Sequence, residues 1–96
     1  MSIRMNTEDV IARGQEIASH EEDVTAIQNY LNDVVNHQLP ELWEGHGYEG
    51  FAARVAEMAP SFQAMRELIR AIGQGVITNA QQYAEFDRAA GSMNRG

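Results

Sequence analysis

A repeat of apolar residues in the second half of the chain constrains the fold more than any other feature. Between residues 51 and 90, largely apolar side chains recur in alternating steps of four and three. This spacing averages 3.5 residues, which is typical of a helix packed along a left-handed helical seam. The stripe predicts a helix over about 51–90 whose dimer seam consists of Phe51, Val55, Met58, Phe62, Met65, Ile69, Ile72 and Val76.

The first half predicts another amphipathic helix, over about 7–39. Asn6 or Thr7 can accept hydrogen bonds from the free N–H groups of its first turn. Pro40 disfavours helical geometry at Leu39, so the helix is expected to end or kink there. Its apolar stripe is formed by Val10, Ile17, Val24, Ile27, Leu31, Val34 and Val35.

Residues 40–50 are expected to form the turn between these helices. Gly45, Gly47 and Gly50 permit the backbone angles of a reversal. Inside the second helix, Pro60 should bend the chain near 55–58, and Gly73 and Gly75 can let another helix approach closely. Residues 91–96 carry no stripe and are expected to be a mobile tail.

These elements predict a single all-α domain over residues 1–96, an antiparallel two-helix hairpin. One short helix cannot cover the broad apolar stripe of the other. We therefore expect two hairpins to dimerise into an elongated four-helix bundle.

Charge and composition exclude several function classes. The net charge is −7, and residues 1–48 carry nine acids against Arg4 and Arg13. An acidic surface argues against nucleic acid as a partner and against direct anchoring on anionic lipid. The first residues lack the apolar run of a signal peptide, and no stretch is long enough to span a membrane.

Trp43-Glu44-Gly45 places the only Trp near the midpoint of the chain, at the predicted bend. Taken alone, Trp43 could be an apolar plug at the hairpin tip. With Tyr48 and Phe51 following the turn, however, the chain resembles the Trp-X-Gly family of roughly hundred-residue type VII secretion substrates, the relatives of the early secreted antigenic target. This resemblance covers essentially the whole sequence.

The resemblance gives a meaning to a second motif, Tyr83-x-x-x-Asp87, near the end of the second helix. Proteins of this family carry Tyr-x-x-x-Asp/Glu there as part of the export signal. Packing of Tyr83 and Phe86 on the apolar stripe is the alternative interpretation. At 1.5 Å per residue Tyr83 lies about 50 Å from the turn, so we expect it to meet Trp43 and Gly45 only across a dimer.

No set of residues indicates catalysis or metal binding. Glu16 and His20, and likewise Asp33 and His37, stand four residues apart, whereas the di-iron bundle signature is Glu-x-x-His. No serine lies in a nucleophile elbow. We expect no enzyme activity, no cofactor and no metal.

The resemblance implies a small secreted effector, or a co-secreted partner, of a type VII secretion system. It would be made in the cytoplasm and exported without a cleaved signal peptide. Its implied partners are a second copy or another Trp-X-Gly protein, and the membrane-bound secretion ATPase. The alternative is an intracellular, chaperone-like module that escorts a larger toxin.

Overall fold

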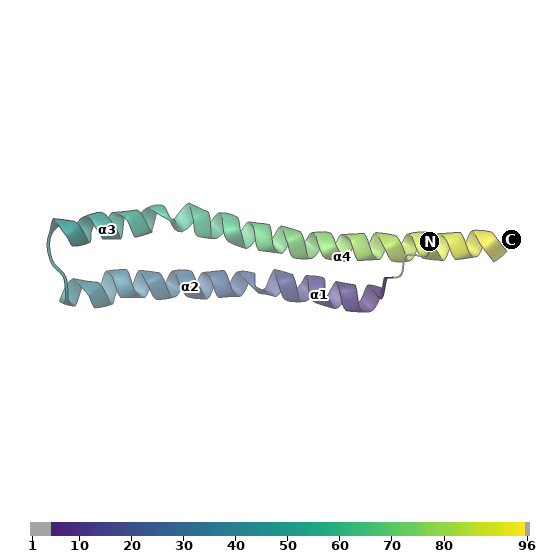
Figure 1. The fold of residues 1–96 in the computed structure, drawn as a ribbon, viewed down its shortest axis with the longest axis horizontal. Coiled ribbons are helices and arrows are strands. Elements are labelled where there is room, and N and C mark those ends of the chain that lie inside the picture. Colours follow the sequence, from purple (N-terminus) through teal and green to yellow (C-terminus); the bar gives the residue numbers. More distant parts are fainter. Residues whose placement is uncertain (1–4, 96) are drawn as a thin grey trace. The chain divides into compact units, whose positions relative to one another are not determined.

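The computed structural model describes residues 5–95, and every regular element in this range is a helix, as predicted. The elements in chain order are α1 (Thr7–Ser19), α2 (Glu21–Asp33), the π-helical η1 (Val34–Gln38), the 3-10 helix η2 (Leu39–Glu41), α3 (His46–Glu57) and α4 (Ala59–Arg95) (Figure 1). By their contacts, the described residues form two compact units. The terminal unit combines residues 5–19 with 69–95, and the turn unit consists of residues 20–68.

The terminal unit is built on a close approach of α1 to α4. Gly14 and Gly73 are both buried. A Cβ atom built on Gly73 would lie 2.6 Å from the carbonyl oxygen of Gly14 and 2.7 Å from the backbone nitrogen of Ala18. Ala80, on the same side of α4 two turns later, has no exposed surface. The expectation of a close helix approach is therefore confirmed at Gly73, where the helix is α1 of the same chain. It is wrong at Gly75, since nothing lies within 4 Å of a Cβ built there.

In the turn unit, α2 and η1 run antiparallel to α3 and the first turns of α4 (Figure 1). Val24 and Val35 form its most buried apolar positions, at 5 % and 4 % exposure. At one edge of the pair, an Arg66 guanidinium nitrogen donates to the side-chain oxygen of Gln28 at 2.6 Å. This hydrogen bond links the two helices, and it places polar groups along that edge.

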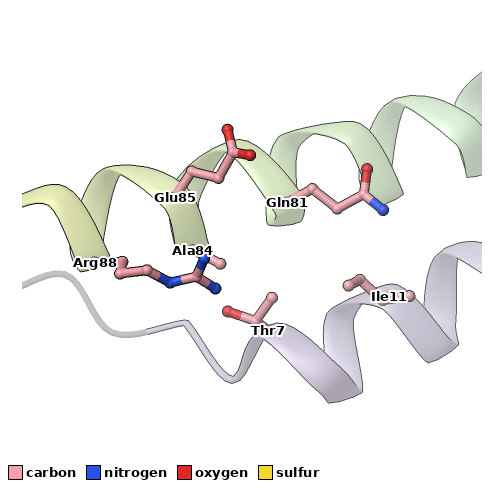
Figure 2. A pocket seen from close by; sticks show the side chains of 6 residues that line it. All are labelled: Thr7, Ile11, Gln81, Ala84, Glu85 and Arg88. Carbon is pink, nitrogen blue, oxygen red and sulfur yellow. The ribbon is translucent and has the colours of Figure 1, made fainter.

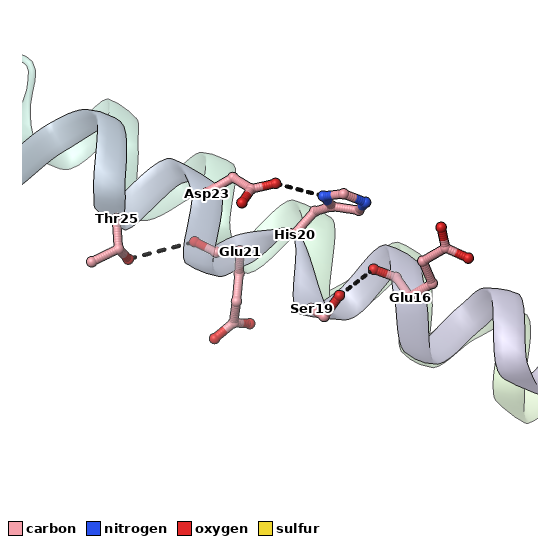
Figure 3. A network of polar contacts seen from close by, with 6 residues as sticks. All are labelled: Glu16, Ser19, His20, Glu21, Asp23 and Thr25. Carbon is pink, nitrogen blue, oxygen red and sulfur yellow. Dashed lines mark hydrogen bonds and ion pairs between the residues drawn. The ribbon is translucent and has the colours of Figure 1, made fainter.

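The prediction of one unbroken helix over 7–39 is wrong at His20, where α1 ends and α2 begins. The Ser19 hydroxyl donates to the carbonyl oxygen of Glu16 at 2.6 Å, and the His20 ring lies 2.6 Å from a carboxylate oxygen of Asp23 (Figure 3). Three acids, Glu21, Glu22 and Asp23, occupy the first turn of α2. Carboxylates favour the positive end of a helix dipole, so this acidic run suits a new N-terminus as well as a solvated face.

The two prolines interrupt the helices in different ways. Pro60 lies in the first turn of α4, and the chain breaks at Met58 between α3 and α4, within the predicted region. Upstream of Pro40, the α-helix ends at Asp33, earlier than predicted, and the chain continues as the wide η1 and then the narrow η2. Because proline lacks an N–H group, the preceding turns must find other hydrogen-bond partners.

The loop and the C-terminal end also differ from expectation. The non-helical connection is shorter than the predicted 40–50, because η2 reaches Glu41 and α3 already begins at His46. The mobile tail predicted for 91–96 is wrong over 91–95, since α4 continues to Arg95. A single Gly in a helix costs only about 1 kcal/mol relative to Ala, so Gly91 does not end α4.

Candidate functional site

The turn around Trp43 depends on Gly45. Its φ is 106° and its ψ is −172°, and it is the only residue in the described range with a positive φ. This backbone region is essentially reserved for glycine. The third position of the Trp-X-Gly motif is therefore explained by the backbone, since Gly45 reverses the chain immediately before α3.

Aromatic rings from α3 support Trp43. The centroid of the Trp43 ring lies 5.9 Å from that of Tyr48, edge to face, and 5.8 Å from that of Phe51. Such pairs add about 0.5–1.5 kcal/mol beyond their buried area. Gly47 makes room for the indole, because a Cβ there would lie 3.2 Å from its Cζ2 atom. Trp43 nevertheless stays 41 % exposed, so it is a supported surface ring rather than a buried plug.

Tyr48 makes a second contact that the sequence did not reveal. Its hydroxyl donates to the carbonyl oxygen of Val35 at 2.5 Å, thirteen residues away in the chain. The Tyr48 side chain, which follows the turn, thus packs against Trp43 and donates a hydrogen bond to η1, both of which precede Gly45. The aromatic spacing drew attention to Tyr48, but only the wide turn in η1 explains this bond.

Tyr83 and Asp87 lie on α4 in the terminal unit, whereas Trp43 and Gly45 lie in the turn unit. Tyr83 is half-buried and Asp87 is exposed. Four residues apart on one helix, they share a face. Their neighbours Glu85 and Arg88 are also exposed, so this surface of α4 is rich in charge.

An open cleft of about 320 Å³ lies in the terminal unit close to these residues (Figure 2). Thr7 and Ile11 of α1 line one side. Four residues of α4 line the other, and they are Gln81, Ala84, Glu85 and Arg88. The lining combines two apolar side chains, those of Ile11 and Ala84, with polar and charged ones, and it contains no nucleophile paired with a base.

The predicted dimer seam divides into two rows along the chain. One row, spaced by seven residues, is half-buried within the chain, and it consists of Val55, Phe62, Ile69 and Val76. The other row is exposed, and it consists of Phe51, Met58, Met65 and Ile72. In this structure only the second row is open to a partner.

Sequence reasoning missed two apolar residues beside the exposed row in the turn unit. They are Leu68 of α4, which is 59 % exposed, and Tyr30 of α2, which is 65 % exposed; Ile27, from the predicted stripe, is 54 % exposed beside them. At 100° per residue, Ile27 and Tyr30 turn to the same side of the helix pair as Met65 and Leu68, opposite the edge that Arg66 closes. We call these four residues the apolar face. Leu68 and Tyr30 lie outside both predicted stripes, so periodicity alone could not find them.

Each histidine lies beside a carboxylate three or four residues away in the chain. The distances from the ring nitrogen Nδ1 are 2.6 Å for His20–Asp23, 3.3 Å for His37–Asp33 and 3.4 Å for His46–Glu49. His20 thus lies beside Asp23, three residues on, where the sequence had drawn attention to Glu16. Over residues 5–95, no three potential ligands cluster closely enough to hold a metal ion. A search of the same residues finds no helix of the length and apolarity that crossing a membrane requires.

Comparisons with known proteins agree with this geometry. Protein YukE of Bacillus subtilis strain 168 is 26 % identical over 94 residues, which cover 98 % of this chain and 96 % of YukE. Geobacillus thermodenitrificans EsxA, in its crystal form I, matches with a TM-score of 0.76 and 26 % identity over 95 % of this chain and all of EsxA. This likeness over nearly the whole of both chains supports the predicted helical hairpin.

A family model described as proteins of 100 residues with WXG, named WXG100, matches residues 2–88. The matched range contains the Trp43 turn and the Tyr83–Asp87 pair. The chain therefore belongs to the WXG100 family, and with it to the small helical proteins of type VII secretion that its Trp-X-Gly turn indicated.

Proposed function

We propose that the chain is exported by a type VII secretion system as one half of a dimer, and that it acts by protein recognition rather than catalysis. The proposal rests on the position of Trp43. The ring is partly exposed, and the aromatic rings of α3 and the Gly45 turn hold it at the surface. Tryptophan is enriched among the residues that dominate binding energies at interfaces. Membership of the WXG100 family supports secretion as the process served.

The apolar face supports a dimer, formed with a second copy or with another Trp-X-Gly protein. Its four residues, Ile27, Tyr30, Met65 and Leu68, are each more than half exposed. Monomeric soluble proteins rarely leave large side chains of this kind grouped on one side of a helix pair. A stable partner would bury about 2,000 Å² or more in total, as obligate interfaces do.

The export signal would be a composite of two chains. Trp43 and Gly45 belong to the turn unit, and Tyr83 and Asp87 belong to the terminal unit. When two hairpins pack antiparallel, the turn of one lies beside the end of α4 of the other. The combined surface would present Tyr83 and Asp87 to the membrane-bound secretion ATPase, with the chain leaving the cytoplasm without a cleaved signal peptide.

The test is to separate export from folding. Tyr83→Ala and Asp87→Ala should abolish the ATPase-dependent appearance of the chain in the culture medium. Their helicity and sedimentation should stay near wild type, because Asp87 is exposed and Tyr83 is only half-buried. Trp43→Ala should also block export, with some loss of stability from the vacated ring site.

Glu85→Ala is the matched control, since Glu85 is an exposed acid on the same stretch of α4 and lies outside the motif. It should be exported normally. If the Tyr83 and Asp87 variants were both exported normally, Tyr83 would serve only in packing and Asp87 only as a surface charge. The chaperone-like module acting inside the cell would then be the better interpretation.

A further inference from the structure

Pro40 creates a backbone problem immediately before the Trp43 turn. In a regular α-helix the N–H of Leu39 would donate to the carbonyl oxygen of Val35. Here it donates to Val34, five residues back, in the wider register of η1. In that register the donor to Val35 would be residue 40, which is a proline without an N–H group. The carbonyl oxygen of Val35 is thus left without either helical donor.

This carbonyl group belongs to a residue that is only 4 % exposed. A buried carbonyl group without a partner is strongly unfavourable, so native structures nearly always supply one. The Tyr48 hydroxyl is that partner, at 2.5 Å. Tyr48 itself is half-buried, which shields the bond from water.

The wide turn leads directly to Trp43. After η1, the carbonyl oxygen of Leu39 accepts hydrogen bonds from the N–H groups of Leu42 at 2.9 Å and Trp43 at 2.8 Å. The Trp43 and Tyr48 rings then pack edge to face at a centroid distance of 5.9 Å. The Tyr48 side chain therefore contacts both η1 and the Trp43 ring.

We propose that Tyr48 is a positioning residue for Trp43. Its hydroxyl replaces the backbone donor that Pro40 removes, and this bond holds η1 in the wide path from which Trp43 reaches α3. The inference deepens the proposed function. It rests on that function at one point, the assignment of Trp43 as the recognition residue. The hydrogen bond and its effect on Trp43 can be tested without any partner or export assay.

Trp43 is the only tryptophan, so tryptophan fluorescence, excited at a wavelength that tyrosine does not absorb, reports on this site alone. Tyr48→Phe keeps the ring that contacts Trp43 and removes the hydroxyl. We expect its emission to shift to longer wavelength and acrylamide to quench it more strongly, because Trp43 is held less firmly. Pro40→Ala restores an N–H group that can donate to Val35. The double variant with Pro40→Ala and Tyr48→Phe should therefore return toward wild-type emission and quenching.

Thr25→Val is the control, because it removes an exposed hydroxyl in the same unit whose hydrogen bond, to the carbonyl oxygen of Glu21 at 3.5 Å, stays within α2. It should leave emission and quenching unchanged. Wild-type fluorescence in Tyr48→Phe would overturn the proposal, as would a double variant no closer to wild type than the single one. If circular dichroism shows that Tyr48→Phe loses helicity, recovery of helicity in the double variant supports the proposal and its absence overturns it. Normal export of Trp43→Ala would count against the proposed function alone.

Discussion

At the scale of single residues, two glycines carry the turn for different reasons. Gly45 has backbone angles that other residues avoid, although nothing lies within 4 Å of a Cβ built on it. Gly47 is helical, and a Cβ there would crowd the Trp43 indole at 3.2 Å. The third glycine of this stretch, Gly50, has neither constraint, since it is helical and faces open space.

These differences predict opposite effects of the same substitution. Gly45→Ala should lower the free energy of unfolding by about 1–3 kcal/mol, because alanine must adopt a strained backbone conformation. Gly50→Ala should raise it by about 0.5–1 kcal/mol, since alanine is the better helix former. Urea unfolding followed by circular dichroism, at one protein concentration, measures both. If the two substitutions changed the free energy of unfolding equally, alanine at position 45 would not be strained.

The sequence predicted Gly45 at the reversal because glycine, the motif and the chain midpoint all agree there. It did not predict the Tyr48 hydrogen bond. That bond exists because η1 shifts the Leu39 donor to Val34, and Pro40 then leaves Val35 without one. Apolar periodicity reports which side chains pack against another helix, and it does not report which backbone N–H group bonds to which carbonyl oxygen.

At the scale of elements, the crossing of α1 and α4 depends on glycine at two positions. Gly73→Ala places a Cβ 2.6 Å from the Gly14 carbonyl oxygen, and neither backbone can yield without separating the helices. Overpacking of this kind costs about 1–3 kcal/mol, more than the helix-propensity gain of about 0.5–1 kcal/mol. Thermal unfolding should therefore show a lower melting temperature for Gly73→Ala.

Gly75→Ala is the matched control on the same helix. Nothing lies within 4 Å of a Cβ at Gly75, so this variant should gain the propensity term and unfold at a higher temperature than wild type. A Gly73→Ala variant as stable as Gly75→Ala would mean that the two helices can separate at no cost. The close approach would then not be a requirement of the fold.

Helix type and approximate extent followed from periodicity, while the breaks within the helices did not. The stripe gave no sign of the break at His20, because Ile17 is half-buried before it and Val24, seven residues later, is buried after it, as in an unbroken helix. The acidic run Glu21-Glu22-Asp23 was the available signal for a new N-terminus. Proline, by contrast, marks an interruption directly, and the break before Pro60 lies where it was predicted.

At the scale of the whole molecule, the predicted seam mixed two kinds of residue that periodicity cannot separate. A 3.5-residue repeat identifies positions that pack against helices, but it does not say whether those helices belong to the same chain. Only the structure distinguishes the half-buried row containing Phe62 from the exposed row containing Met65. In the turn unit, Met65 of this row together with Ile27, Tyr30 and Leu68 is the surface that the proposed dimer must cover.

This division sharpens the prediction for assembly. Met65→Asp places a charge on the apolar face, where a partner would have to bury it unpaired, at a cost of several kcal/mol. Met65 is 52 % exposed within the chain, so the substitution should disturb the hairpin itself far less than the dimer. Analytical ultracentrifugation at micromolar concentration should find the wild-type chain as a dimer and Met65→Asp shifted toward monomer.

Gln63→Asp is the control for added charge. Gln63 is exposed and lies two residues before Met65 on α4, where a rotation of 200° turns it to the opposite side, beside Arg66. The same carboxylate at this position should leave the dimer intact, because it stays in water. If both aspartate variants sediment like wild type, the apolar face is not where the partner binds. A wild-type chain that is a well-folded monomer, and that no other Trp-X-Gly protein converts to a dimer, would contradict the four-helix bundle altogether.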